Sequence, residues 1–479
     1  MKKILLLSVA TASLLVGSSI EELQAQLTKQ QETINLLQTK LEQLVEAKAS
    51  ENASTAKTIK KEATKKEVLQ DKMRDIRKPL RKKKASSSFA QQAFMPDISL
   101  IGDLSYVDRK NDTTHTNMPG LTHAEHGDDD GHSHNALNGD DGFNLNYAEL
   151  VLQSTVDPYV DMTAVFHLTD SDFEIEELYA NSRGLPNGLG LKVGKFFSNF
   201  GRLNAQHHHV WNFADQPLVN NAFLGEHGLN EKGLALNWLA PTPFYLDLGV
   251  EVLKGSNEYS FGDAAITLTE DVGVAKVSAP NLKVAYAKVG ADVGDVAVLG
   301  GLSYADGDAR LNHLTDEEDP HAFAGSSKIY GADLTLKKPL GAYSDLTWTT
   351  EYMKRELDGT QYAPNTAKDA WASQVALSKE QSGYYSSLIY KMDKDWRMGL
   401  RYDDILSNDV VANGTNKNLS DDMNRYSAMV EYNFSEFNRL RLQYNKDNSK
   451  FNEDGAKIKN DEIMLQLNMA IGSHGAHSF

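Results

Sequence analysis

Apolar and polar residues alternate with a period of two through most of the chain that follows Asp97. In residues 426–434, for example, Tyr, Ala, Val, Tyr and Phe fall on one face, and Ser, Met, Glu and Asn fall on the other. A period of two is typical of β-strands that have one apolar and one polar face. The same alternation recurs in residues 330–337, 396–403, 439–445 and 462–471. The pattern therefore predicts an all-β fold for the larger part of the chain.

The lengths of the connections between these segments limit the possible folds further. Short connections rich in turn residues occur near 157–158, 185–188, 240–243, 291–295, 339–344, 393–395 and 435–436, and they alternate with connections that are mostly longer. Barrels of bacterial outer membranes have an even number of strands, short turns at one end and longer loops at the other. We therefore predict a transmembrane antiparallel β-barrel of about 16 strands over residues 97–479. The expected strands are 97–107, 143–155, 159–168, 173–182, 189–197, 231–239, 244–254, 281–290, 295–305, 328–338, 344–356, 382–391, 395–405, 424–434, 438–448 and 461–471.

Two other assignments compete with this one. The stretch 370–379 is also strand-like, but a further strand there would break the alternation of connections, so we place it in a hairpin on the long-loop side. A large soluble β-sandwich or propeller is the alternative fold, and no blade repeat is visible in the sequence. The mean hydropathy of −0.46 does not decide between them, because the strands of a membrane barrel never form a long apolar run.

The N-terminal residues 1–18 combine two Lys, an apolar run and small residues, and so predict a secretory signal peptide. No later stretch of about 18 apolar residues predicts a transmembrane helix. Residues 19–46 carry two rows spaced seven apart, Ile20, Leu27, Ile34 and Leu41, and Leu23, Gln30, Leu37 and Leu44. Such heptads predict an oligomerising coiled coil, a dimer or a trimer, although a single helix lying on its own barrel would show the same stripe.

Residues 47–96 form a basic helical or linker region, which would contact anionic lipid or a cell-wall polymer or would simply be solvated. The chain that follows the last basic run is acidic. Residues 85–479 hold 31 Lys and Arg against 56 Asp and Glu, and the net charge of the whole chain is −17. An acidic channel body would favour cations near its mouth. The C-terminal Phe479 resembles the signal that outer-membrane barrels present to their assembly machinery.

The first long loop, 111–142, is rich in His and acidic residues and contains no Lys or Arg. Imidazole and carboxylate groups together suit Zn²⁺, Ni²⁺ or Cu²⁺, and short His-rich tracts often bind metal. We therefore expect either weak binding of a divalent cation, Zn²⁺ first, or a solvated polar loop. The candidate ligands are His115, His123, His126, His132, His134, Asp128, Asp129 and Asp130. No cofactor is expected to be required.

The second long loop, between the strands 189–197 and 231–239, is expected to fold against the lumen and to narrow it, because long loops on a regular scaffold usually carry function. Its constriction candidates are Arg202, His207, His208, His209, Trp211 and Asp215. Of three consecutive His in an extended chain, at most two alternate ones can face one ion, and packing of the loop on the wall is the other interpretation. Lumen-facing candidates on the strands are Asp333, Lys337, Arg397, Arg401, Asp403, Glu431, Arg439 and Arg441.

The block GKFFSNFGRLNAQHHHVWNFADQPL, together with the leader, the heptads and the barrel pattern, resembles Gram-negative outer-membrane porin-like proteins. The coiled coil followed by a barrel is similar to phosphate-selective and related trimeric porins. The motif with His207, His209, Trp211, Asp215, Gln216 and Pro217 is similar to proteins often labelled zinc-regulated or TonB-dependent outer-membrane receptors. The resemblance implies an outer-membrane location, a homotrimer with a periplasmic coiled coil, and lipid and the barrel-assembly machinery as partners.

The expected function is passive passage of small hydrophilic solutes or ions, with divalent metal, and zinc first, as the sharper hypothesis. The alternative is a non-conducting or gated barrel that captures metal or a partner through its outer loops. No hydrolase triad, P-loop, HExxH or nucleotide-binding signature is present, so neither an enzyme nor a nucleic-acid partner is expected.

Overall fold

The computed structural model describes residues 96–111, 116–122, 137–169, 173–257, 259–316, 319–452 and 454–472. The chain divides into two units, Met1–Ser87 and Ser88–Phe479, and all the described residues belong to the second. The predicted signal peptide, the coiled coil and nearly all of the basic region 47–96 therefore lie outside the described residues. So do the C-terminal Phe479 and the metal-ligand candidates His115, His123, His126, His132, His134, Asp128, Asp129 and Asp130.

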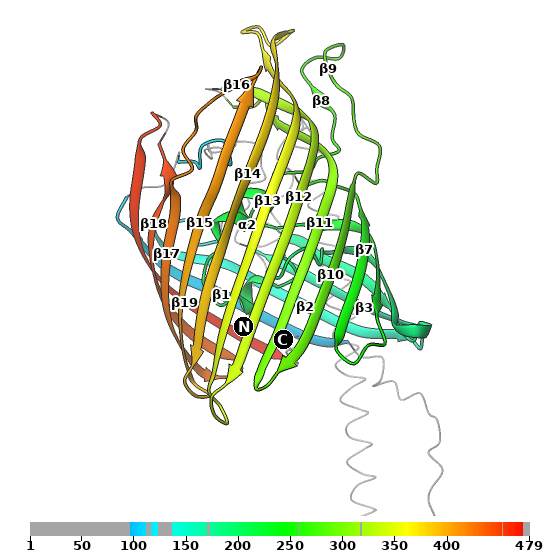
Figure 1. Cartoon of the computed structure of the whole chain (residues 1–479), viewed down its shortest axis with the longest axis vertical. Coiled ribbons are helices and arrows are strands. Elements are labelled where there is room, and N and C mark those ends of the chain that lie inside the picture. Colours follow the sequence, from blue (N-terminus) through cyan, green and yellow to red (C-terminus); the bar gives the residue numbers. More distant parts are fainter. Residues whose placement is uncertain are drawn as a thin grey trace, which may run out of the picture. The chain divides into compact units, whose positions relative to one another are not determined.

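Sixteen long strands form one closed antiparallel barrel (Figure 1). Each strand pairs with its neighbour along the chain, and β1 pairs with both β2 and β19, which closes the sheet. The strands are β1 (Asp97–Arg109), β2 (Gly142–Asp157), β3 (Val160–Leu168), β4 (Phe173–Ser182), β5 (Leu189–Phe197), β6 (Asn230–Leu239), β7 (Tyr245–Leu253), β10 (Leu282–Val293), β11 (Val296–His313), β12 (His321–Pro339), β13 (Asp345–Pro364), β14 (Trp371–Lys391), β15 (Trp396–Ala412), β17 (Met423–Ser435), β18 (Asn438–Phe451) and β19 (Lys457–Gly472). The predicted barrel and strand number are confirmed.

The remaining elements are short. The two-residue strand β16 (Thr415–Asn416) pairs antiparallel with the end of β15, and β8 (Ile266–Thr267) pairs with β9 (Gly273–Val274) outside the barrel sheet. The described helices are η2 (Pro186–Gly188), η3 (His208–Val210) and α2 (Leu218–Leu224). None of the helices in the described part of the chain is long and apolar enough to cross a membrane.

The strands extend further than predicted on the long-loop side, where β11 and β13 end later and β12 and β14 begin earlier. Strands β11 to β14 run for 18, 19, 20 and 21 residues, well past the predicted ends. The stretch 370–379 is the first half of β14 and not a strand of its own. The reason is that the ladder of backbone hydrogen bonds continues where the outward residues turn polar, so the apolar alternation fades before the strand does.

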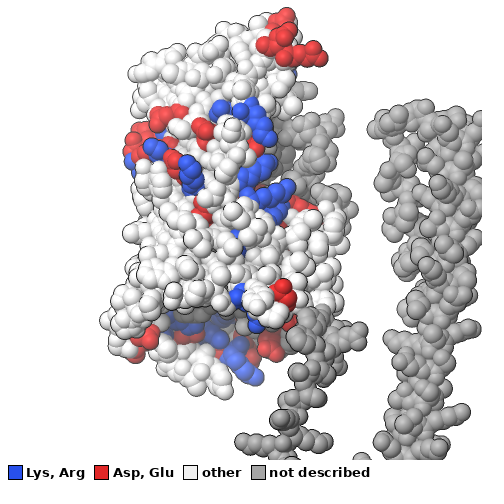
Figure 2. Space-filling model, turned by 90° about the vertical axis from the view of Figure 1, so that its right-hand side faces the viewer, with Lys and Arg blue, Asp and Glu red and all other residues white. Residues whose placement is uncertain are grey.

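The faces of the strands follow the period of two. On β17, Tyr426 and Val430 expose 53% and 44% of their surface, whereas Ser427 and Glu431 expose 3% and 0%. Outward apolar residues recur around the barrel, with Leu302 at 65% exposed among them. In Figure 2, Lys, Arg, Asp and Glu gather mainly at two levels of the wall, and the surface between these levels is mostly free of charge. The barrel thus has an apolar outer belt, and the buried charged side chains of its strands face the interior.

Candidate functional site in the barrel lumen

The connection between β5 and β6 folds into the barrel. Phe197 and Asn230 remain register partners, and the Ser198 amide donates to the Leu229 carbonyl at 2.8 Å, so the sheet is unbroken where the chain leaves it. We call residues 198–229 the lumen loop. Figure 1 shows α2, which belongs to this loop, within the barrel.

Apolar packing holds the α2 end of the lumen loop against the wall. Leu218, Val219 and Phe223 expose 3% of their surface or less and belong to one continuous apolar cluster. Each fully buried side chain of this kind stabilises the fold by roughly 1.5–3 kcal/mol. The cluster also contains inward-facing residues from many strands: Ala235, Leu253, Leu282, Val284, Ala305, Ile329, Met353, Tyr385, Ile405, Met423 and Phe451. The inner wall is therefore apolar beside α2, and the lumen loop shields this part of the wall from water.

Arg355 of β13 holds the end of α2. Its Nη1 donates to the Ala222 carbonyl at 3.2 Å, and its guanidinium carbon lies 4.7 Å from the centre of the Phe223 ring. Its Nη2 donates to Gln381 Oε1 at 2.6 Å. A cation near the last carbonyls of a helix complements the partial negative charge there, so Arg355 stabilises α2 in the lumen.

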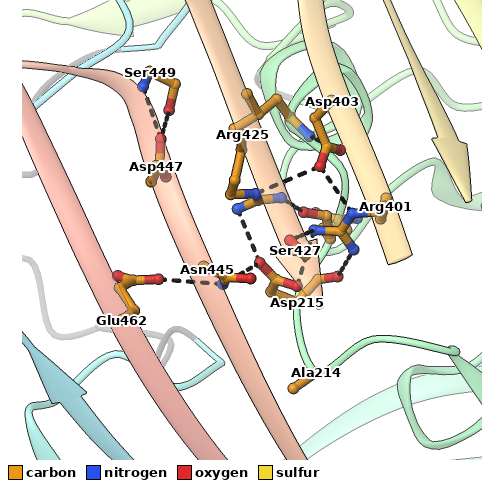
Figure 3. Close-up of polar contacts among 12 residues, drawn as sticks. Ala214, Asp215, Arg401, Asp403, Arg425, Ser427, Asn445, Asp447, Ser449 and Glu462 are labelled. Atoms are coloured by element: carbon orange, nitrogen blue, oxygen red, sulfur yellow. Dashed lines mark hydrogen bonds and ion pairs between the residues drawn. The ribbon is translucent and has the colours of Figure 1, made fainter. Parts of the chain in front are cut away.

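Asp215 is the central polar anchor of the lumen loop (Figure 3). Its Oδ1 lies 3.0 Å from Arg401 Nη2, and its Oδ2 lies 2.9 Å from Arg425 Nη1. Gln443 and Asn445 donate to the same carboxylate at 2.6 and 3.0 Å. Burial raises the pKa of Asp215, but the charges of Arg401 and Arg425 outweigh burial, and the pKa lies below its ordinary value. The carboxylate is therefore ionised and paired.

Two buried glutamates of the wall bind the backbone at the start of the lumen loop. Glu251 accepts from the Asn199 amide at 3.0 Å, and Glu351 accepts from the Arg202 amide at 3.0 Å. Between them, Gly201 has a φ of 64°, and a Cβ there would lie 1.9 Å from Glu351 Oε1. Glycine is required at this position because both the positive φ and the close carboxylate exclude a side chain.

The His segment of the lumen loop meets three carboxylates on β2 and β4. His207 Nε2 lies 2.8 Å from Glu177 Oε2, and His209 Nδ1 lies 3.1 Å from Glu149 Oε2. His167 of β3 joins them, with its Nε2 2.9 Å from Glu176 Oε2. Burial lowers the pKa of His207, but the nearby carboxylates of Glu149, Glu176 and Glu177 outweigh burial and raise this pKa well above the ordinary value.

None of these ion pairs includes His208, which packs among rings. Its ring centre lies 4.4 Å from that of Trp211 and 5.9 Å from that of Tyr147. Burial lowers the pKa of His208 to about 3, so this imidazole is neutral at physiological pH. Trp211 is itself buried and donates from Nε1 to the Gln206 carbonyl at 3.1 Å. His208 and Trp211 therefore pack against each other, whereas His207 and His209 face carboxylates.

A cavity of about 1140 Å³ lies below the lumen loop, toward the short turns of the barrel. We call it the turn-side cavity. Four acidic residues line it, Glu177, Asp215, Asp345 and Glu436, and seven basic residues line it, Lys192, Arg202, Lys337, Lys391, Arg397, Arg401 and Arg439. Although the chain is acidic, the cavity lining therefore carries an excess of basic side chains.

The predicted site residues can now be placed. All the described constriction candidates belong to the lumen loop: Arg202, His207, His209, Trp211 and Asp215 line the turn-side cavity, and His208 does not. All the lumen-facing candidates lie on the inner face of their strands. Lys337, Arg397, Arg401 and Arg439 line the cavity, whereas Asp333, Asp403, Glu431 and Arg441 are buried.

Several residues that hold the loop are not predicted by the sequence patterns, namely Glu149, His167, Glu176, Glu177, Glu251, Glu351 and Arg355. The sequence does carry an indication of two of these residues, Glu176 and Glu177. In residues 173–182, FEIEELYANS, two acidic residues stand side by side and interrupt the alternation. In the structure the register of β3 and β4 shifts at this point. Here the doubled acidic residue coincides with a β-bulge.

The fold and the lumen define the class: a closed 16-stranded antiparallel β-barrel with a loop folded into its interior. The chain belongs to the same family as an uncharacterized protein of Aquifex aeolicus (strain VF5), to which it is 48% identical over 396 residues, 82% of each chain. No protein-family model matches the chain.

Several solved structures of outer-membrane proteins and porins are similar to this chain. They include a loop-deletion mutant of the outer-membrane protein OmpT of Vibrio cholerae, 13% identical with a TM-score of 0.46, covering 79% of this chain and 100% of that one. They also include the outer-membrane channel DcaP of Acinetobacter baumannii, 12% identical with a TM-score of 0.44, covering 78% and 96%. An anion-selective porin from Comamonas acidovorans is 11% identical with a TM-score of 0.45, covering 78% and 99%. The assignment of a barrel rests on this chain's own strand register.

Proposed function

We propose that the protein is a porin-like channel of the outer membrane through which small hydrophilic solutes pass passively, narrowed by the lumen loop. The observation that carries the proposal is the turn-side cavity of about 1140 Å³, polar and charged, inside a closed barrel with an apolar outer belt. Barrels of 16 strands are wide enough to leave an aqueous channel. An apolar belt flanked by charge is the outer surface that a bilayer requires.

A charged side chain on the outer face of a barrel in a bilayer destabilises the fold by an amount that depends on its depth. We expect Leu302→Arg, in the middle of the belt, to destabilise the barrel by about 2–4 kcal/mol, and Val293→Arg, beside a short turn, by about 0–1 kcal/mol. Both side chains point outward, with 65% and 67% of their surface exposed. Unfolding by urea in lipid vesicles measures the two costs. Equal costs at the two positions would contradict a bilayer around this belt.

The charge of the cavity lining suggests which solutes pass. Seven basic side chains against four acidic ones favour anions on the turn side, in contrast to the cation preference expected from the net charge. Passage of divalent metal, zinc first, would instead depend on the His-rich loop at the other end of the barrel. We expect single-channel recordings across a salt gradient to give stepwise conductance with an anion-biased reversal potential. Zinc-dependent block, lost when the five loop histidines are replaced by Ala, would support the metal hypothesis instead.

A second candidate function is a gated or non-conducting barrel that binds a ligand or partner. The observation that favours it is the apolar cluster, which joins α2 to inward residues from β6 round to β18 at one level of the lumen. Such packing narrows the water-filled cross-section more than a polar constriction loop would. Absence of conductance from a barrel shown to be folded would favour this class over an open channel.

The remaining parts of the proposal concern assembly. We propose a homotrimer joined by the coiled coil of residues 19–46 in the periplasm, with Phe479 as the residue that the barrel-assembly machinery recognises. We assign the protein no catalytic activity, no required cofactor and no nucleic-acid partner. Cross-linking of the full chain and of a chain that lacks residues 19–46 tests the oligomeric part directly.

A further inference from the structure

Three imidazoles and three carboxylates meet where the lumen loop touches β2, β3 and β4. The loop contributes His207 and His209, β3 contributes His167, and the other two strands contribute Glu149, Glu176 and Glu177. The three glutamates expose 1%, 5% and 5% of their surface. So many ionisable groups are seldom brought together out of water unless each one is paired or binds a metal.

A β-bulge aims two of the carboxylates at one place. Val165 pairs with Glu177 and Phe166 pairs with Ile175, so Glu176 is an extra residue in β4. In a regular strand the side chains of Glu176 and Glu177 would point to opposite faces, and one of them would reach the apolar outer belt. The bulge turns both inward, and bulges commonly re-aim a side chain beside a functional site.

The donor atoms form two sets that share Glu149, one with His207 and His209 and one with His167 and Glu176, and within each set they are spaced like the ligands of one ion. From Glu149 Oε2 the distances to His167 Nε2, His207 Nδ1 and His209 Nδ1 are 3.3, 3.4 and 3.1 Å. From Glu176 Oε2 the distances to His167 Nε2 and His207 Nδ1 are 2.9 and 3.3 Å. Ligands that lie about 2.1 Å from a transition metal are roughly 3.0–3.4 Å apart in octahedral or tetrahedral geometry. Four of the five distances fall in this range, and the distance of 2.9 Å between Glu176 Oε2 and His167 Nε2 lies just below it.

Hydrogen bonds among these groups alone do not satisfy them. His207 Nδ1, Glu176 Oε2 and Glu149 Oε1 are buried atoms with no hydrogen-bond partner of acceptable geometry in the described part of the chain. Three imidazole nitrogens converge on the single oxygen Glu149 Oε2, which has only two lone pairs. A cation among these groups would bind several of these atoms at once.

The surroundings of His207 match those of a metal-bound imidazole. With Nδ1 facing Glu149 and Glu176, its Nε2 lies 2.8 Å from Glu177 Oε2, and the other oxygen of Glu177 accepts from the Phe197 amide at 3.0 Å. Metal-binding histidines usually donate their second ring N–H to a carboxylate, which fixes the tautomer and the orientation of the ring. Glu177 would therefore be a positioning residue and not a ligand.

We propose that His167 Nε2, His207 Nδ1, His209 Nδ1, Glu149 and Glu176 bind one divalent transition-metal ion that fastens the lumen loop to β2, β3 and β4. Mixed nitrogen and oxygen donors suit Zn²⁺, Co²⁺, Ni²⁺ or Mn²⁺, whereas Ca²⁺ and Mg²⁺ prefer oxygen alone. The site does not depend on whether the barrel conducts. None of its five proposed ligands comes from the His-rich loop 111–142.

The test uses untagged, refolded full-length chain in which the five histidines of the 111–142 loop are replaced by Asn. After chelator treatment, CoCl₂ or ZnCl₂ is added, and bound metal and the visible spectrum of Co²⁺ are measured. We expect one ion per barrel, and loss of that ion in His207→Ala/His209→Ala. The matched control, His313→Ala/His321→Ala, removes another neighbouring His pair, whose ring centres are 5.2 Å apart, and should keep the ion.

Milder variants keep the result interpretable if the double variant does not fold. Glu176→Gln preserves shape and removes a ligand charge, and Glu177→Gln should weaken binding about 10- to 100-fold through the orientation of His207. Folding is checked by circular dichroism and heat-modifiable gel mobility. A folded background chain that binds no ion, or an ion that survives both His207→Ala/His209→Ala and Glu176→Gln, would overturn the proposal and leave an ion-paired network of protonated histidines.

Discussion

Replacing Asp215 with Asn is expected to destabilise the barrel by about 3 kcal/mol or more and to release the central part of the lumen loop. The change leaves Arg401 and Arg425, whose side chains expose 2% and 9% of their surface, to share Asp403 as their remaining acidic partner. Removing one partner of a buried ion pair typically costs about 3–5 kcal/mol, because a charge remains buried without compensation. Urea unfolding in lipid vesicles measures the loss, and iodide quenching of Trp211, in a chain whose other four Trp are replaced by Phe, reports release of the loop.

The loss of stability in Asp215→Asn should depend on pH in a way that identifies the paired Asp215 carboxylate as its cause. Because the pKa of Asp215 is lower in the folded than in the unfolded chain, its ionised form stabilises the fold fully above the ordinary pKa of 3.8. That stabilisation is lost as the pH falls through the folded-state pKa. The difference between wild type and Asp215→Asn should thus be constant from neutral pH to about pH 5 and shrink only in stronger acid.

Asp345→Asn is the matched control for this experiment. Asp345 also lines the turn-side cavity, but its carboxylate accepts from the Thr347 hydroxyl at 3.2 Å at the edge of β13 and is half-buried. The same change of charge there should cost well under 1 kcal/mol, as is usual for exposed charges. Comparable losses at the two positions would show that the Asp215 cluster does not anchor the loop.

Excising the lumen loop is expected to raise single-channel conductance several-fold. Since Phe197 pairs with Asn230 and Ser198 bonds to Leu229, an Asn-Gly turn in place of residues 199–228 would close a tight hairpin without changing the register. The apolar cluster loses α2, and the lumen at the level of Ile329 and Met353 opens to water. Planar-bilayer recordings of wild-type and excised chains measure the change.

Phe223→Ala is the milder companion to the excision. It removes one ring of the cluster, costs about 3–5 kcal/mol, and should raise the frequency of open events more than the size of each step. If a folded, excised barrel conducts like wild type, the loop is not the constriction. If neither conducts, the barrel is not a channel, and the binding or gated class becomes the better description.

Local covalent geometry explains how much of the fold can be predicted from the sequence. Side chains of a strand alternate between its faces whatever the rest of the chain does, so the period of two alone assigns the exposed Tyr426 and the buried Glu431 to opposite faces. Turn residues likewise mark the short connections. The ends of β11 to β14 are not predicted correctly, because the backbone ladder outlasts the apolar pattern that indicates these strands.

The candidate site is predictable only as a list of residues. The loop stands out for its length and its three histidines, but no local pattern gives the partners of His207 or Asp215. Asp215 meets Arg401 and Arg425, which lie near the far end of the chain and reach it only when β15, β17 and β18 close the barrel. Glu176 faces the histidines only because a bulge reverses the direction that the alternation predicts.

The sequence by itself thus determined the barrel, its even number of strands and which side of each strand faces outward, because these depend on a period of two and on turns between neighbours. The closed sheet decided that the lumen loop lies inside, and that His207 and His209 face carboxylates while His208 packs on Trp211. The physical reason is that burial and charge pairing depend on contacts between segments far apart in the chain. Those contacts exist only once β1 and β19 have met.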